Sequence, residues 1–163
     1  MEPRFVVIDS EYRDAAPGQV EVVCMVAIDL SNGRVYRMWL EGSSLSSPPF
    51  PCGPGTILVA HAVAPAEARC WRTLNWPEPG GWIDTYVESR VIASGERPEG
   101  GFGLLACCLR SGIKSISADH KHVMRELVLR GGPYSAEERK SILDYCESDV
   151  RETHQLFGKL LKP

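Results

Sequence analysis

The sequence predicts a single α/β domain, residues 1–163, in which a central mixed sheet of five strands is flanked by helices. Three observations predict it. Apolar, β-branched runs dominate the first forty residues, and an Asn-Gly turn joins two of them. A strand–helix–strand segment follows, and the rest of the chain has helical hydrophobic periodicity. Strands followed by helices indicate a layered domain, and 163 residues suit one core.

The first three expected strands form an antiparallel meander. Residues 4–8 are an apolar run that we expect to be a buried strand ending at Asp9. Residues 20–30 and 34–40 are the second and third strands. Ser31-Asn32-Gly33 lies between them, and Asn-Gly favours the tight turns that join antiparallel strands.

Two parallel strands are expected to complete the sheet. Residues 41–55 are rich in Ser, Pro and Gly and are typical of a loop. The fourth strand is expected at 56–60, a helix at 64–74 with Pro65 in its first turn, and the fifth strand at 82–85. Further helices are expected at 86–92, 103–111, 119–129 and 136–161, and the last is long enough to bend or break.

The composition is that of a soluble globular protein. Hydrophobic residues make up 44% and the net charge is -3. No stretch reaches the ~20 apolar residues of a membrane span, and the N-terminus has no signal-peptide pattern, so we expect a cytosolic protein. The six cysteines form no Cys-x-x-Cys pair, and we interpret them as reduced core thiols.

Asp9 and Glu11 are the first candidate site residues. Residues i and i+2 of a strand point to the same face, so the two carboxylates repel each other unless a cation lies between them. Divalent hard cations prefer carboxylate oxygens. The alternative is a polar strand end in solvent.

Tyr145 and Asp149 are the second candidate pair. At i and i+4 of the expected last helix they are neighbours on one face, at the border of its apolar stripe. We therefore expect them to face a groove next to the core. The alternative is an ordinary amphipathic helix with a tyrosine at its edge.

Two further acids follow expected strands. Glu67 lies early in the helix after His61, where it could be a third metal-site carboxylate or be favoured by the helix dipole. Asp84 follows a short apolar run and could cap the next helix. His61, considered alone, is typical of a hydrogen-bonded structural histidine.

Together these segments resemble the DEDD-type 3'-5' exonucleases, over nearly the whole chain. Asp9-x-Glu11, the His61 segment with Glu67, Trp-Ile-Asp84-Thr and Tyr145-x-x-x-Asp149 occur in the order of that family, and the Tyr marks its DEDDy branch, which includes the proofreading domains of family A DNA polymerases. The resemblance implies a ribonuclease H-like fold. The family's second motif usually has Asp five residues after the histidine position, whereas this chain has Ala66 there and Glu67 next. If Glu67 is not the third acid, Asp84 is its substitute, or the enzyme is impaired.

The resemblance also implies two Mg²⁺ or Mn²⁺ ions, held by Asp9, Glu11, Glu67 and Asp149. Asp9 would bridge both ions, and Tyr145 would orient the attacking water. The implied function is 3'-5' hydrolysis of single-stranded or frayed DNA ends, of the proofreading type and in partnership with a polymerase domain or subunit.

Residues 110–130 contain five Lys and Arg residues but only two acids, so positive charge is concentrated in this segment. Lys121 and Arg125 share a helix face, and we expect them to contact substrate phosphates together with His61. The alternative is a solvated basic face. Three other functions remain open: an RNA-trimming exonuclease, a degenerate module that binds nucleic acid without cutting it, and a structural domain with no site.

Overall fold

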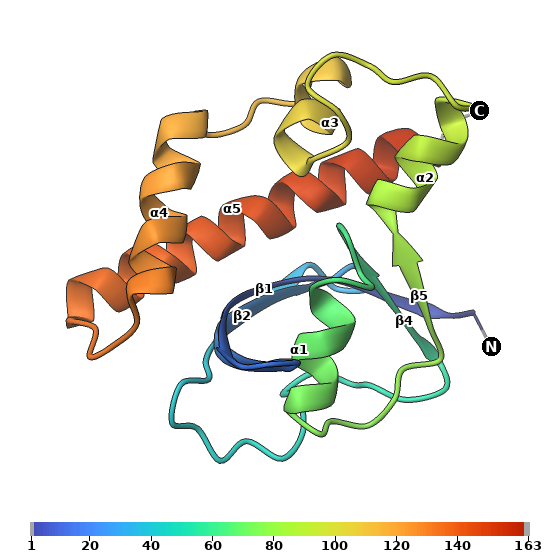
Figure 1. Ribbon diagram of the computed structural model, residues 1–163. Coiled ribbons are helices and arrows are strands. Elements are labelled where there is room, and N and C mark those ends of the chain that lie inside the picture. The colour runs from blue at the N-terminus through green and yellow to red at the C-terminus, as the bar shows by residue number, and fades with distance from the viewer. Residues whose placement is uncertain (1, 162–163) are drawn as a thin grey trace.

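The computed structural model describes residues 2–161 and has helices on both faces of one sheet (Figure 1). The strands come first in the chain and most of the helices come after them, as the hydrophobic pattern predicts. The final helix lies across the strands that begin the chain, so the first and last thirds of the sequence pack against each other.

Strand β1 (Arg4–Ala16) lies in the middle of the sheet. On one side it is flanked by β2 (Gln19–Asp29) and then β3 (Arg34–Trp39), with both pairings antiparallel. On the other side it is flanked by β4 (Thr56–Ala60) and then β5 (Gly81–Asp84), with both pairings parallel. The predicted meander with added parallel strands is confirmed.

Helix α1 (Glu67–Thr73) covers one face of the sheet, and α5 (Ala136–Leu160) crosses the other (Figure 1). Helix α4 (Ala118–Arg130) packs against α5 and β1. Helices α2 (Thr85–Ile92) and α3 (Leu104–Arg110) both pack against α5. Within the part of the chain that the structure describes, no helix is both long and apolar enough for a membrane crossing.

The strand period of two explains how β1 supports both layers. Val6 and Ile8 point to the α1 face, where Trp71 is the largest buried side chain. Val7 points to the opposite face and packs with Ile142 of α5. Each apolar side chain is fully buried, which stabilises the fold by roughly 1.5–3 kcal/mol per residue. The sheet therefore fixes α1 and α5 relative to β1.

Two element boundaries differ by more than one residue from those expected. β1 does not end at Asp9 but continues to Ala16, because β2 stays paired with it through bulges. The first helix begins at Glu67 rather than at residue 64, and Pro65 precedes it. The Asp84 carboxylate holds the backbone N–H groups of Ala62 and Val63 at 2.9 and 2.8 Å, which fixes this segment in a turn. The last helix is continuous over its whole length and does not break.

All six cysteines are free thiols, as expected, and five of them are buried. Cys52 is partly exposed. Cys24 and Cys146 belong to the core beneath α5, whereas Cys107 and Cys108 pack between α3 and the end of α5. They act mainly as small apolar side chains, with one exception described below.

Candidate active site

A pocket of about 200 Å³ lies where β1 passes between α1 and α5. Residues far apart in the sequence meet in it, because the sheet brings β1 next to both helices. It is lined by every residue predicted to be catalytic: Asp9, Glu11, Glu67, Tyr145 and Asp149. Of the residues predicted to bind substrate, His61 and Arg125 line it.

Asp9 and Glu11 lie within β1 rather than at its end. β4 pairs with β1 only as far as Val7, whereas β2 stays paired along its whole length. One edge of β1 is therefore free of strand pairing from Asp9 onward, which leaves space for the pocket. A register shift between Glu11 and Tyr12 bends the strand at this point, as bulges beside active sites commonly do.

Glu67 is the first residue of α1 and is only 2% exposed. Its carboxylate accepts hydrogen bonds from the backbone N–H of Ser10 at 3.2 Å and from the Ser10 hydroxyl at 2.6 Å. Ser10 lies between Asp9 and Glu11, so these bonds tie the third acid to the first two. Glu67 lies one residue later than the expected Asp, and its side chain is one methylene longer. Its carboxylate nevertheless lies in the pocket.

Tyr145 and Asp149 lie one turn apart on α5 and face the pocket, as their spacing predicts. On another side of α5, Arg37 of β3 pairs with Asp144 at 2.5 Å and Glu147 at 3.1 Å. These exposed pairs stabilise the fold little, but they add to the apolar packing that holds α5 on the sheet.

Burial disfavours the charged forms of all four carboxylates, and repulsion by neighbouring acids of the cluster adds to this effect at Asp9 and Glu11. Burial raises the pKa of Asp9 and Glu11 well above their ordinary values, and the charge of Asp149 adds to both shifts. Burial also raises the pKa of Asp149, and raises that of Glu67 to about 7. A divalent cation would relieve both effects, because it neutralises charge and is bound by carboxylate oxygens. The donor set therefore fits Mg²⁺ or Mn²⁺.

Cys146 is a site residue that the sequence did not reveal. Its thiol lies 3.2 Å from the Asp9 carbonyl oxygen and 3.5 Å from an Asp9 carboxylate oxygen, and donates a hydrogen bond there. Ligand atoms of Asp9, Glu11 and Cys146 lie within 4.8 Å of one another. Burial raises the pKa of the Cys146 thiol well above its ordinary value, so it stays a donor. Its place in the apolar stripe of α5 made it resemble a core residue.

Lys121 binds protein carboxylates rather than projecting free for a phosphate. Its ammonium lies 2.5 Å from an Asp149 oxygen and 2.9 Å from Glu152. Glu152 is 4% exposed and also accepts from the backbone N–H of Ile116 at 3.3 Å. No sequence pattern indicated this role of Glu152, because it lies one turn beyond the Tyr145–Asp149 motif.

Arg125 is a cation that lines the pocket. It is exposed, and it has no hydrogen bond or ion pair with the residues that the structure describes. It lies one helical turn from Lys121, as the spacing predicts. Its charge lowers the pKa of Glu11, against the larger effect of burial. Its position suits contact with an anion that enters the pocket.

His61 is held by both ring nitrogens, as expected of a structural histidine. Nδ1 lies 2.9 Å from the Thr85 hydroxyl and Nε2 lies 2.9 Å from the Phe102 carbonyl oxygen, to which it donates. Burial lowers its pKa, which favours the neutral ring. One side of the ring still borders the carboxylate pocket.

Asp84 caps α2 and does not line the pocket. Its carboxylate accepts from the backbone N–H of Tyr86 at 2.9 Å, in addition to its bonds with Ala62 and Val63. These three bonds engage both carboxylate oxygens. The structure therefore brings Glu67, and not Asp84, to the other three acids.

Comparisons with known proteins relate this fold to exonuclease domains. No protein-family model matches the chain, and no curated protein matches it. Among solved structures, the EXO domain of Nibbler from Aedes aegypti is 12% identical with a TM-score of 0.61, over 98% of this chain and 79% of that one. The apo form of a nuclease is 16% identical with a TM-score of 0.68, over 95% and 70%.

A third solved structure is RNase D from Trypanosoma brucei in complex with RNA U12. It is 16% identical with a TM-score of 0.65, and the match covers 99% of this chain and 56% of that one. At these identities the likeness shows the fold alone. The chain thus has the α/β fold of exonuclease domains, as its resemblance to the DEDD type implies.

Proposed function

We propose that this chain is a metal-dependent 3'-5' exonuclease that hydrolyses phosphodiester bonds at single-stranded or frayed 3' ends. The observation that carries the proposal is the gathering of Asp9, Glu11, Glu67 and Asp149 in one pocket of a fold shared with exonuclease domains. Buried carboxylates repel one another, and a protein keeps such a cluster when cations are bound there.

The four carboxylates are proposed to hold two divalent cations. Bound Mg²⁺ or Mn²⁺ supplies a Lewis acid and lowers the pKa of water, so that hydroxide is available at neutral pH. Burial raises the pKa of Asp9, and the charges of both Glu67 and Asp149 raise it further, so acids of two other elements act on Asp9. It is therefore the residue best placed to serve both ions. The Cys146 thiol orients its carboxylate by donating a hydrogen bond.

Tyr145 is proposed to orient the attacking water. Burial and the nearby charges of Glu11 and Asp149 raise the pKa of its hydroxyl, so the group stays protonated at neutral pH. A protonated hydroxyl can hold a water molecule in position but is a poor general base. Arg125 is proposed to contact a phosphate beside the scissile one, because its guanidinium lines the pocket and has no ion pair among residues 2–161.

The proposal predicts a defined pattern of products. A single-stranded oligonucleotide labelled at its 5' end should shorten stepwise in Mg²⁺ or Mn²⁺, and the same oligonucleotide labelled at its 3' end should release the label as a mononucleotide first. EDTA should stop both reactions. Cleavage that starts at the 5' end, or that persists in EDTA, would contradict the proposal, and metal binding without cleavage would favour a degenerate binding module.

The substrate is proposed to be DNA or RNA, and each has an observation in its favour. The Tyr145-x-x-x-Asp149 segment resembles proofreading domains, which act on DNA beside a polymerase in the cytosol. The fold is also that of an RNase D bound to RNA. Rates on DNA and RNA oligonucleotides of one sequence decide between them, because recognition of the 2'-hydroxyl depends on local contacts. A rate ratio above about tenfold in either direction identifies the substrate.

A further inference from the structure

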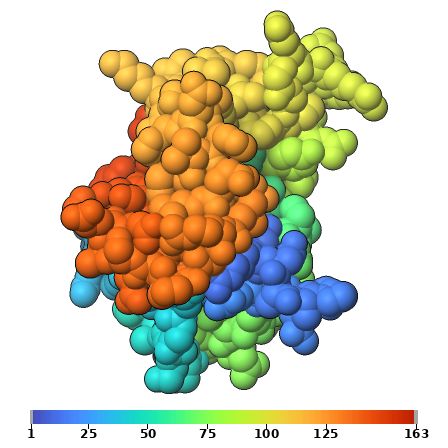
Figure 2. All heavy atoms as spheres, turned by 60° about the vertical axis from the view of Figure 1, so that its left-hand side comes forward, coloured from blue at the N-terminus to red at the C-terminus, as the bar shows by residue number. Residues whose placement is uncertain are grey.

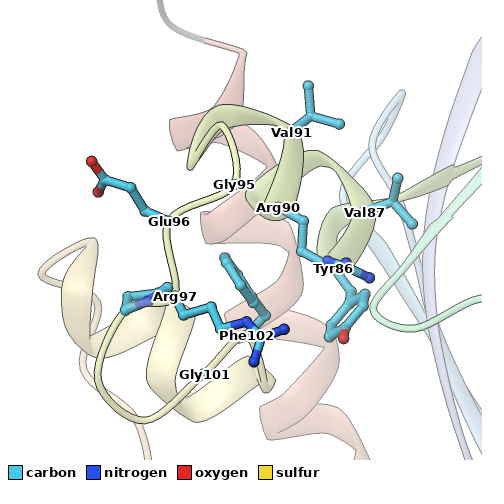
Figure 3. Close-up of a pocket in the computed structure, with 10 residues that line it drawn as sticks. Tyr86, Val87, Arg90, Val91, Gly95, Glu96, Arg97, Gly101 and Phe102 are labelled. Atoms are coloured by element: carbon cyan, nitrogen blue, oxygen red, sulfur yellow. The ribbon is translucent and has the colours of Figure 1, made fainter.

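A second and larger hollow, of about 840 Å³, lies between α2 and the segment that follows it (Figure 3). Its walls come from Tyr86, Arg90, Arg97 and Phe102, together with backbone of the glycine-rich segment 95–101. In Figure 2 the yellow-green part of the chain after α2 stands out from the body of the molecule. Most residues that line the hollow are exposed, so it is open to solvent, and its volume is within the range of ligand sites.

The hollow is lined by two arginines and one acid, Glu96, so its charge is positive. Arg90 and Arg97 are both exposed, and neither has an ion pair or hydrogen bond with the residues described, 2–161. Figure 3 shows both side chains extending toward the rings of Tyr86 and Phe102, whereas the Glu96 carboxylate points away. Two unpaired guanidinium groups that converge in this way suit an anion with more than one phosphate group.

The same hollow presents aromatic rings. The rings of Tyr86 and Phe102 have centroids 6.2 Å apart and are nearly perpendicular, at 77°. The Arg90 guanidinium lies 5.7 Å from the Tyr86 ring centroid. Both rings remain partly exposed. Aromatic rings between basic side chains are the combination that binds single-stranded nucleic acid, with bases stacked on rings and phosphates on cations.

His61 connects this hollow to the carboxylate pocket. Its ring borders the carboxylate pocket and lies edge-on to Tyr86, with centroids 5.7 Å apart. Its Nε2 donates to the Phe102 carbonyl oxygen. His61 lines the carboxylate pocket and touches two residues that line the hollow, so it lies between the two cavities. A strand whose 3' end lies among the carboxylates could continue past His61 onto the rings.

The wall of the hollow is held in place before any ligand arrives. Arg110 donates to the carbonyl oxygen of Gly101 at 2.6 Å, and His61 holds the next residue, Phe102. Gly100 and Gly101 have φ values of 75° and 71°, which side chains rarely adopt, so the backbone here lies open to a close approach. A preformed site binds with less loss of conformational entropy.

We infer that this hollow is a binding subsite for single-stranded nucleic acid on the 5' side of the scissile bond. The inference rests on the proposed function for its position along the strand. Arg90 and Arg97 bind phosphates, and Tyr86 and Phe102 stack on bases with little preference for sequence. The carboxylate pocket holds the 3'-terminal nucleotide, so the subsite is reached only by longer strands.

Equilibrium binding in EDTA tests the subsite apart from hydrolysis. Thymidine and uridine oligonucleotides of two, four and eight nucleotides carry a 5' fluorophore, and binding is measured by fluorescence anisotropy. The wild-type chain should bind the octamer at least about tenfold more tightly than the dimer. A variant with Arg90→Gln and Arg97→Gln should lose that gain, and its slope of log Kd against log salt should fall by about 1.4, for two lost phosphate contacts on a single strand.

Two further variants sharpen the test. Arg34→Gln with Arg72→Gln removes the same charge from exposed positions outside both cavities, and should leave octamer binding and the salt slope as in the wild type. Tyr86→Leu should weaken octamer binding several-fold with no change in the salt slope, since it removes stacking and no charge.

The outcomes separate the subsite from the proposed function. Octamer binding in the Arg90 and Arg97 variant that equals the wild type, or a wild-type affinity that does not grow with length, overturns the subsite even if the chain hydrolyses oligonucleotides. Length-dependent binding that needs both arginines, in a chain that hydrolyses nothing, supports the subsite and contradicts the proposed function.

Discussion

At the scale of single residues, Ser10 has an effect out of proportion to its size. Its backbone N–H and its hydroxyl both bind Glu67, so one small residue between Asp9 and Glu11 fixes the third acid relative to the other two. The position of Glu67, one residue later than the family pattern, left the sequence ambiguous between Glu67 and Asp84. Glu67 is held beside the first two acids by hydrogen bonds between residues 57 positions apart, which no local pattern reveals.

Substitution of Glu67 should mainly lower the hydrolysis rate, whereas substitution of Asp84 should mainly lower the stability of the fold. Glu67→Ala should lower the hydrolysis rate by about two orders of magnitude or more while leaving the chain folded, because it removes a carboxylate of the proposed metal site. Asp84→Ala should lower the free energy of unfolding by about 1–2 kcal/mol, because it removes a helix cap, and leave the rate nearly unchanged well below its Tm. Oligonucleotide assays and urea denaturation measure the two effects, and the reverse pattern would identify Asp84 as the functional acid.

The pKa of Glu67 predicts how stability depends on pH without metal. Its folded-state pKa, about 7, is above the ordinary value of 4.5, so the folded chain binds more protons than the unfolded chain between these values. Its favourable contribution is complete below about pH 4.5 and is lost as the pH rises through 7. Asp9, Glu11 and Asp149 shift in the same direction.

In EDTA, therefore, the Tm should fall as the pH is raised from 5.5 to 8. Glu67→Gln should reduce this fall, because glutamine stays neutral while keeping most of the shape of the protonated acid. Scanning calorimetry across the pH series measures both chains. A Tm that rises over this range, or a Glu67→Gln chain with the wild-type slope, would refute the account of the buried cluster.

At the scale of the elements, the sequence predicts the strand order of the meander and the extent of α5. It does not predict the end of β1 or the start of α1. Periodicity and the Asn32-Gly33 turn are local signals, and the structure follows them. The extension of β1 beyond Glu11 depends on pairing with β2, and its residues lack an apolar run. The start of α1 depends on Asp84, which is bound to the turn before it. Both boundaries are set by tertiary contacts.

Gly80 is a second element-scale constraint, because it lets β5 approach the loop before β4. Its N–H lies 2.8 Å from the Gly53 carbonyl oxygen, and a Cβ at this position would lie 2.1 Å from the carbonyl oxygen of Pro54. Gly80→Ala should therefore lower the free energy of unfolding by about 1–3 kcal/mol, as overpacking does. Gly81→Ala is the matched control, since its Cβ would meet nothing within 4 Å. Equal losses in urea denaturation would show that the close approach is not the cause.

At the scale of the whole molecule, three elements distant in sequence each contribute part of one acidic pocket. β1 supplies two carboxylates, α1 supplies one, and α5 supplies one together with Tyr145. The order of these motifs along the chain predicted the pocket from sequence. The contacts of Cys146, Lys121 and Glu152 could not be predicted in the same way, because they depend on how α4 and α5 pack over β1.

Bound cations should stabilise the whole fold, because they relieve the repulsion among the buried acids. A ligand at 100 times its Kd stabilises the folded state by about 2.7 kcal/mol. Mn²⁺ should therefore raise the Tm at pH 7.5, and the rise should be largely lost in Asp9→Asn, which lacks a central carboxylate. Differential scanning fluorimetry measures the shift. A wild-type Tm that does not respond to millimolar Mn²⁺ would count against the metal site.

The central claim is that the carboxylate pocket performs the hydrolysis, and paired substitutions on α5 test it most directly. The measurement is the initial rate of mononucleotide release from the 3' end of a single-stranded oligonucleotide in Mn²⁺. Asp149→Ala should lower the rate by about three orders of magnitude or more, whereas Asp144→Ala, an exposed acid on the same helix, should keep it within a few-fold of the wild type. Equal rates in the two folded variants would contradict the assignment of the pocket.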